Sequence, residues 1–280
     1  MMRRALIPAM LWLAATMTSA TADELHVLAA GSLREVIGEI GDHYRQATGT
    51  TVAADFGPSG VLRERIEKGE RTDLFASADM GHPVKLMAEG RASRVAMFTR
   101  NALCGIALAK TGLTASNFLD KLLDPAVKLG TSTPKADPAG DYTWAMFERA
   151  EALRPGSFRT LDQKAQKIVG GPSNNAQANN APVGGKDPVV AALSSGLIDV
   201  MIGYCSGRKR LMPLLADAQF VEPPKEIATG PEYGLAVLKD SAPRTEDLAL
   251  FMLSPDAQQL FARNGFAPVG LPMGWRSPNH

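Results

Sequence analysis

Leu25-His-Val-Leu-Ala-Ala-Gly-Ser-Leu-Arg-Glu-Val-Ile37 is the stretch that decides the fold of this chain. A short apolar run ends in small residues, and apolar positions at helical spacing begin just after Ser32. This pattern predicts a strand that turns directly into a helix. A helix start presents unpaired backbone N–H groups and a partial positive charge, so it favours an anion, and the Ser32 hydroxyl adds a donor. The alternative is that Ser32 only caps its own helix.

Comparable helix starts recur three more times along the chain. They lie at Phe56-Gly-Pro-Ser59-Gly60, at Pro138-Ala139-Gly140 and at Lys186-Asp187-Pro188. Each of them alone is a routine cap, but together they suit a cleft at the carboxyl ends of parallel strands. Tyr204 ends another apolar run, so we expect its hydroxyl to reach the same cleft. The alternative for Tyr204 is a half-buried tyrosine at a strand end.

Short apolar runs alternate with longer amphipathic segments along the whole chain, which predicts an α/β fold with βαβ units and mostly parallel pairing. The expected strands are 25–30, 51–56, 73–77, 102–109, 127–131, 199–204, 218–221 and 233–238. The expected helices are 33–47, 60–68, 80–89, 115–122, 140–153, 160–169, 187–195, 206–215, 243–252 and 255–263. Residues 170–186 are rich in Gly, Asn and Pro and are expected to form a loop.

The first 22 residues have the pattern of a signal peptide. Arg3 and Arg4 precede an apolar run that is too short to span a bilayer, and Ala20-Thr-Ala22 is a small-x-small cleavage site. We therefore expect a mature chain that starts at Asp23 and lies outside the cytoplasm. Cleavage lowers the number of basic residues from 30 to 28, against 29 acidic residues. This near-neutral balance argues against nucleic-acid binding.

Cys104 and Cys205 each lie in or just after an apolar run. In an oxidising compartment they are expected to form a disulfide, and the alternative is two buried free thiols. Enzyme motifs are weak. Ser132-Thr-Pro-Lys135 matches Ser-x-x-Lys, but its proline disrupts the helix that this motif needs. The histidines lack metal-ligand spacing, so no metal site is expected. A secreted enzyme with Cys205 or Ser32 as nucleophile is the rival from a different class, and it lacks an evident base.

Several motifs in fixed order resemble those of the periplasmic molybdate-binding proteins of ABC importers, over nearly the whole mature chain. These motifs are Ala29-Ala-Gly-Ser-Leu33, Phe56-Gly-Pro-Ser-Gly60, Asp73-Leu-Phe-Ala-Ser-Ala-Asp79, Pro138-Ala-Gly140, Ile202-Gly-Tyr204, Ser254-Pro-Asp-Ala-Gln258 and Phe261-Ala-Arg-Asn-Gly-Phe266.

The resemblance implies a two-lobed venus-flytrap fold in which the chain crosses the hinge twice. Lobe 1 is then expected over 23–101 and 234–280, and lobe 2 over 102–233. The family holds tetrahedral oxyanions through neutral donors. Carried over by position, the ligand-binding residues are Ser32, Ser59, Ala139, Lys186 with Asp187, and Tyr204.

The resemblance also implies a function. We expect a monomeric periplasmic binding protein, not an enzyme, that delivers molybdate or tungstate to an ABC permease in the inner membrane and needs no cofactor. Neutral donors favour a fully ionised oxyanion over a protonated one, because a protonated ligand would place donor against donor. The alternative is the same fold with another anion, such as sulfate or a small carboxylate. A lysine at position 186 would place a charge beside the ligand.

Overall fold

The computed structural model describes residues 24–170 and 187–270. Strand β1 (Glu24–Ala30) is followed by a 3-10 turn, η1 (Gly31–Leu33), and then by helix α1 (Arg34–Thr48). The predicted strand-to-helix turn is therefore confirmed. Helix α1 buries Val36, Ile37 and Ile40 on one face and ends at Gly49, whose φ of 78° is the left-handed conformation that favours glycine.

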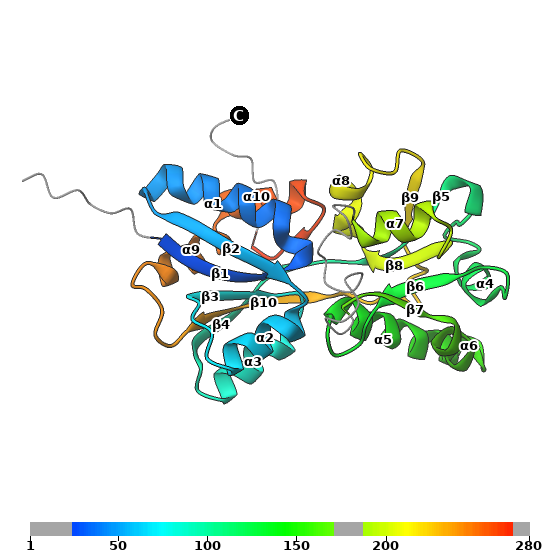
Figure 1. The fold of residues 1–280 in the computed structure, drawn as a ribbon, viewed down its shortest axis with the longest axis horizontal. Coiled ribbons are helices and arrows are strands. Elements are labelled where there is room, and N and C mark those ends of the chain that lie inside the picture. Colours follow the sequence, from blue (N-terminus) through cyan, green and yellow to red (C-terminus); the bar gives the residue numbers. More distant parts are fainter. Residues whose placement is uncertain (1–23, 171–186, 271–280) are drawn as a thin grey trace, which may run out of the picture.

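The described chain builds two mixed sheets, each covered by helices on both faces (Figure 1). We call the six-stranded sheet with its helices lobe 1 and the five-stranded sheet with its helices lobe 2. The α/β two-lobed architecture predicted from the sequence is confirmed. Within the described residues the chain passes between the sheets twice, from β4 to β5 and from β9 to β10.

Lobe 1 has the strand order β11-β4-β10-β3-β1-β2. Helices α1, α9 and α10 cover one face of this sheet, and α2 and α3 cover the other (Figure 1). Its remaining elements are β2 (Thr51–Gly57), α2 (Ser59–Glu67), β3 (Leu74–Ser77), α3 (Gly81–Ala88), β4 (Ala92–Arg100), β10 (Glu232–Leu238), α9 (Thr245–Leu253), α10 (Pro255–Arg263) and β11 (Ala267–Pro268).

Lobe 2 has the strand order β7-β6-β8-β5-β9. Helices α4, α5 and α6 pack on one face, while α7 and α8 pack on the other. Its elements are β5 (Leu103–Leu108), η2 (Ala109–Thr111), α4 (Phe118–Leu123), β6 (Leu129–Ser132), α5 (Pro138–Leu153), α6 (Ser157–Lys164), β7 (Gln166–Val169), α7 (Pro188–Ser194), β8 (Val200–Tyr204), η3 (Cys205–Gly207), α8 (Arg208–Leu211) and β9 (Ala218–Val221).

Among the strands of the described residues, parallel pairing is confined to β1 with β2 and β3, and to β6 with β7 and β8. The strands next to the crossings, β4, β10, β5 and β9, pair antiparallel with their neighbours. Antiparallel pairing is therefore more extensive than the alternation of strands and helices suggested.

Two expected helices are wrong in part, and strands β4, β7 and β11 were not expected. The helix predicted over 160–169 ends at Lys164, and Gln166–Val169 forms β7, because Ile168 and Val169 extend the sheet beside β6. The helix predicted over 206–215 is a 3-10 turn followed by α8, which ends at Leu211, two residues before Pro213. Strand β4 carries polar residues among its apolar ones and gives no clear apolar run.

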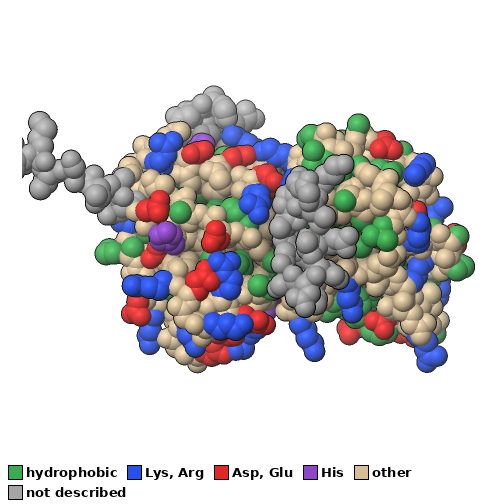
Figure 2. Space-filling view, viewed as in Figure 1, with side chains coloured by type: hydrophobic (Ala, Val, Ile, Leu, Met, Phe, Trp, Pro, Cys, Tyr) green, Lys and Arg blue, Asp and Glu red, His purple; other side chains and the backbone are tan. Residues whose placement is uncertain are grey.

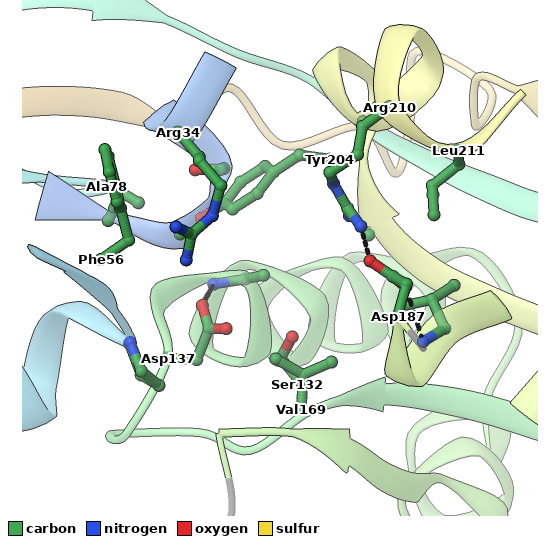
Figure 3. A pocket seen from close by; sticks show the side chains of 18 of the residues that line it. Arg34, Phe56, Ala78, Ser132, Asp137, Val169, Asp187, Tyr204, Arg210 and Leu211 are labelled. Atoms are coloured by element: carbon green, nitrogen blue, oxygen red, sulfur yellow. Dashed lines mark hydrogen bonds and ion pairs between the residues drawn. The ribbon is translucent and has the colours of Figure 1, made fainter. Parts of the chain in front are cut away.

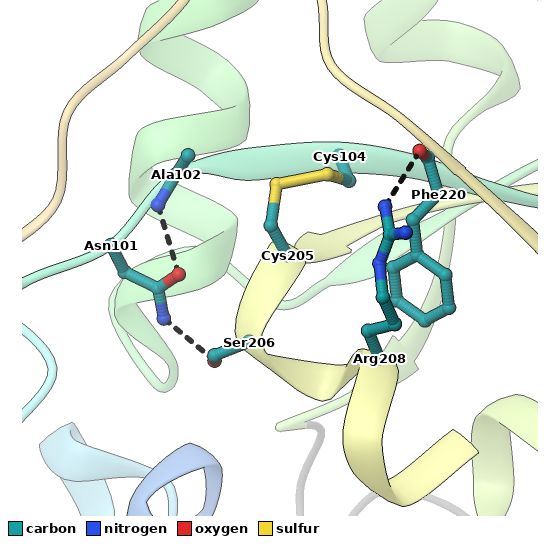
Figure 4. The surroundings of a disulfide bond; sticks show 7 residues. All are labelled: Asn101, Ala102, Cys104, Cys205, Ser206, Arg208 and Phe220. Carbon is teal, nitrogen blue, oxygen red and sulfur yellow. Dashed lines mark hydrogen bonds between the residues drawn. A yellow bond between two sulfur atoms is a disulfide. The ribbon is translucent and has the colours of Figure 1, made fainter. Parts of the chain in front are cut away.

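Cys104 and Cys205 form a disulfide, as predicted, and their Cα atoms are 5.1 Å apart (Figure 4). The bond joins the first turn after β8 to β5, the strand that leaves the first crossing. On the face shown in Figure 2, basic and acidic side chains are interspersed over lobe 1. No helix within 24–170 or 187–270 combines the length and hydropathy of a membrane span.

Candidate functional site

A cavity of about 630 Å³ lies between the two lobes (Figure 3). Ser32 and Ser59 line it from lobe 1, and Ala139, Asp187 and Tyr204 line it from lobe 2. The structure therefore brings together five of the six residues that the sequence singled out, although they come from five separate segments. Lys186 is outside the described residues. That these residues bind a ligand stays a prediction.

Ser59 is the first residue of α2 and is buried, with 1% of its surface exposed. The N-cap of that helix is Pro58, so Ser59 does not cap it. Instead its Oγ accepts a hydrogen bond from the backbone N–H of Ala78 at 3.0 Å. A hydroxyl that accepts a bond in this way still has its own proton to donate.

Ser32 lies inside the η1 turn, and neither η1 nor α1 has a side-chain cap. The alternative that Ser32 caps its helix is therefore not what the structure shows. Its Oγ lies 3.0 Å from the hydroxyl oxygen of Tyr233, a fully buried residue of β10. The hydrogen bond to Tyr233 fixes the Ser32 side chain at the cavity wall.

Ala139 is placed at the cavity, but its backbone N–H already has a partner. Asp137 is the N-cap of α5, and its Oδ1 accepts from the Ala139 N–H at 3.0 Å. Burial, helped by the nearby charges of Asp141 and Asp79, raises the pKa of Asp137 to about 6 against the lowering effect of its hydrogen bonds. The cavity lining thus includes a carboxyl group whose pKa is raised above that of an ordinary aspartate.

Asp187 caps α7 by accepting hydrogen bonds from the N–H groups of Val189 and Val190, at 2.9 and 3.2 Å. Its carboxylate also forms an ion pair with Arg210 of α8. The negative charge of Asp187 is therefore compensated within lobe 2. Proximity to an anionic ligand costs less for a paired carboxylate than for an isolated one.

Tyr204 ends β8 and directs its side chain to the cavity wall (Figure 3). Its hydroxyl is buried and has no hydrogen-bond partner among the described residues. Burial raises the pKa of Tyr204 well above its ordinary value, so the phenol keeps its proton. An unpaired buried O–H group is unfavourable unless an acceptor is supplied. A ligand oxygen in the cavity would supply that acceptor.

Two arginines that line the cavity, Arg34 and Arg210, were not predicted from the sequence. The Arg34 guanidinium lies 4.5 Å from the centre of the Phe56 ring and reaches from α1 toward lobe 2 (Figure 3). No ion pair of Arg34 is found within the described part of the chain. The signal that could have identified Arg34 is its position in the first turn of the helix that follows Ser32.

The arrangement suits binding better than catalysis. Cys205 is in a disulfide and is not available as a nucleophile. The side-chain partner of Ser32 is the Tyr233 phenol. Burial raises the pKa of this phenol, so it stays protonated and does not serve as a base. Among residues 24–170 and 187–270, no group of three or more His, Cys, Asp or Glu is placed to hold a metal ion. Hydroxyl donors from both lobes around one cavity are suited to grip an anionic solute.

Comparison with known proteins agrees with this geometry. A family model described as bacterial extracellular solute-binding protein matches residues 25–267. An uncharacterised protein of Pasteurella multocida is 35% identical and covers 88% of this chain and 99% of its own length. The molybdate-binding protein ModA of Escherichia coli is 31% identical over 62% of this chain and 70% of its own.

Two solved structures show the same fold. The periplasmic molybdate-binding protein of Azotobacter vinelandii aligns with a TM-score of 0.68 and 20% identity, covering 89% of this chain and 99% of its own. The sulfate-binding protein SubI of Mycobacterium tuberculosis aligns with a TM-score of 0.72 and 17% identity, covering 88% and 87%. At these identities the likeness concerns the fold alone.

Proposed function

The chain belongs to the bacterial extracellular solute-binding proteins that serve ABC importers, and we propose that its solute is a tetrahedral oxyanion of the molybdate and tungstate class. In this proposal the cavity between the lobes holds the oxyanion, and the loaded protein delivers it to an ABC permease. The protein acts as a monomer without a cofactor, after cleavage of the leader near Ala22.

One observation carries the proposal. The hydroxyls of Ser59 and Tyr204 face one cavity from opposite lobes, and both have a proton to donate. Neutral donors of this kind hold an ionised acceptor without a counter-charge, and hydrogen bonds to an ionised acceptor are among the stronger ones. A ligand that contacts both lobes also stabilises the closed form, because only differential contacts shift a conformational equilibrium.

A second candidate is the same protein binding sulfate or a small carboxylate. Arg34 favours it, since a guanidinium without an acidic partner among the described residues suits planar or tetrahedral oxyanions alike. The molybdate class is preferred because the ModA relative is similar over most of its own length.

Isothermal titration calorimetry of the mature protein with molybdate, tungstate, sulfate and phosphate tests both candidates. Thermal unfolding should confirm the result, because a thousandfold excess of ligand over its Kd adds about 4 kcal/mol to the free energy of unfolding. Tighter binding of sulfate than of molybdate would select the second candidate. The absence of heat and of a melting shift with all four anions would overturn the proposed function.

A further inference from the structure

We propose that Asn101 and Tyr233 are positioning residues that turn the Ser32 hydroxyl into an obligate donor toward the bound anion. The inference rests on the proposed function and deepens it, because neither residue lines the cavity. We call Asn101, Tyr233 and Ser32 together the relay.

The relay is a chain of buried hydrogen bonds. The Asn101 side-chain amide, 3.0 Å from the Tyr233 hydroxyl, donates to it, and that hydroxyl lies 3.0 Å from Ser32 Oγ. The exposed fraction is 6% for Asn101 and 0% for Tyr233. A second hydrogen of the same amide goes to Ser206 Oγ at 2.8 Å (Figure 4).

The direction of each bond follows from the one before it. The backbone N–H of Ala102 can only donate, and it donates to Asn101 Oδ1 at 2.9 Å, so the other end of the amide is the NH₂ group. That NH₂ group must donate to the Tyr233 oxygen. The Tyr233 proton then needs another acceptor, because a buried O–H without one is costly.

Two hydroxyls lie near that of Tyr233, those of Ser32 and Tyr204. Within the described residues the Tyr204 hydroxyl makes no hydrogen bond, so Ser32 Oγ, at 3.0 Å, is the acceptor for the Tyr233 proton. Burial raises the pKa of Tyr233, so that proton is not lost to ionisation. Ser32 therefore accepts from Tyr233 and keeps its own proton for the cavity. Ser59 reaches the same state by a shorter route, through the N–H of Ala78.

The relay also lies at the junction of the two crossings. The backbone N–H of Asn101, between β4 and β5, donates at 2.9 Å to the carbonyl oxygen of Pro231, just before β10. A change in the backbone geometry of the crossings would therefore move Asn101, which orients the Tyr233 hydroxyl and, through it, Ser32. Ser206 lies outside the relay, although it accepts a hydrogen bond from the same Asn101 side-chain amide.

Tyr233→Phe removes the donor to Ser32 and keeps the ring. We expect it to weaken binding of the preferred oxyanion about three- to tenfold, as the loss of one orienting hydrogen bond predicts. Ser206→Ala is the matched control, because it also deletes one hydrogen bond of Asn101. It should lower the melting temperature without ligand comparably and leave the affinity unchanged.

A double-mutant cycle separates positioning from general stability. In a Ser32→Ala background, Tyr233→Phe should cause no further loss of affinity, since the hydroxyl it orients is gone. Equal losses in both backgrounds, or wild-type affinity of Tyr233→Phe, would overturn the relay.

Asn101→Asp reverses the direction of the hydrogen bonds along the relay with little change in the shape of the side chain. The carboxylate can still accept from Ala102 N–H, but it forces Tyr233 to donate to it, so that Ser32 donates to Tyr233 and not to the anion. We expect a larger loss of affinity than with Tyr233→Phe, and wild-type affinity here would also overturn the relay.

All variants are titrated with molybdate, tungstate, sulfate and phosphate. A wild-type protein that binds none of them overturns the proposed function and the relay together. A wild-type protein that binds one, with variants that bind equally well, overturns the relay alone.

Discussion

The backbone N–H of Gly60 in α2 donates a hydrogen bond to the carbonyl oxygen of Ala136 at 3.2 Å, so main chain of lobe 1 touches main chain of lobe 2. A Cβ atom at residue 60 would overlap the carbonyl oxygen of Lys135 and lie 3.0 Å from that of Ala136. Gly60→Ala should therefore hold the lobes apart and weaken ligand binding. Small-angle scattering with saturating ligand should show a larger radius of gyration than for wild type.

Gly38→Ala in α1 is the control for that variant. A Cβ at Gly38 meets nothing within 4 Å, and alanine in a helix should raise stability by about 0.5–1 kcal/mol. If Gly60→Ala binds and closes as wild type does, the close contact does not limit closure.

Ser59→Ala should weaken oxyanion binding about five- to hundredfold, because it removes a donor to the ligand at a cost of roughly 1–3 kcal/mol. Ser157→Ala is its matched control. Ser157 is also a buried serine at the first position of a helix, but it lies away from the cavity. Calorimetry of the two variants measures the effect, and equal affinities would exclude Ser59 as a ligand contact.

Anion affinity should fall as the pH rises through about 6, because a bound anion disfavours ionisation of Asp137. The same raised pKa predicts that the ligand-free protein loses stability as the pH rises from 3.8, the ordinary pKa, to about 6. Asp137→Asn keeps an acceptor for the Ala139 N–H and should flatten both profiles. Calorimetry and urea unfolding between pH 4 and 8 check this, and an unchanged slope in Asp137→Asn would contradict it.

Arg34→Gln should lower the affinity for a divalent anion by about two- to fivefold at low salt, and by less at high salt. The guanidinium is exposed at the cavity edge, so salt screens its charge. Arg45→Gln, in the last turn of the same helix, is the control. Equal salt dependence of binding in Arg34→Gln and wild type would place Arg34 outside the site.

Reduction of the disulfide should lower the free energy of unfolding by about 4–5 kcal/mol in the chain-entropy model, given a sequence separation of 101 residues. Urea unfolding of a variant with Cys104→Ser and Cys205→Ser measures this loss. Intact-mass analysis after alkylation gives the independent check. Two alkylatable thiols in denatured, unreduced protein would show that the bond does not form.

The sequence predicted the fold well where apolar runs are long and uninterrupted. Each strand expected from such a run is present, because a strand covered on both faces must be apolar at nearly every position, as β1 and β3 are. Strand β4 is mostly half-buried and carries Arg94 and Arg100 among its apolar residues, so it left no such run. The segment Gln166–Val169 continues a helical pattern in sequence, and its pairing with β6 decides its conformation.

The site was predictable to the level of which segments meet, since strand ends and helix starts converge at one edge of an α/β sheet. The hydrogen-bond and ion-pair partners of the individual site residues were not predictable. The Ala139 N–H donates to Asp137 within the same helix start, and Asp187 is paired with Arg210 of helix α8. Ser32 was expected as a cap or a ligand donor, and its bond to Tyr233 joins residues 201 positions apart.

The Cys104–Cys205 bond closes a covalent ring that contains most of lobe 2. Strands β5, β6, β7 and β8 and the helices between them all lie inside this ring. A single cut of the main chain anywhere between residues 105 and 204 would leave two pieces that stay attached, one on each sulfur. Proteolysis within that span therefore changes the connectivity of lobe 2 without releasing a fragment, whereas one cut at either crossing divides the molecule.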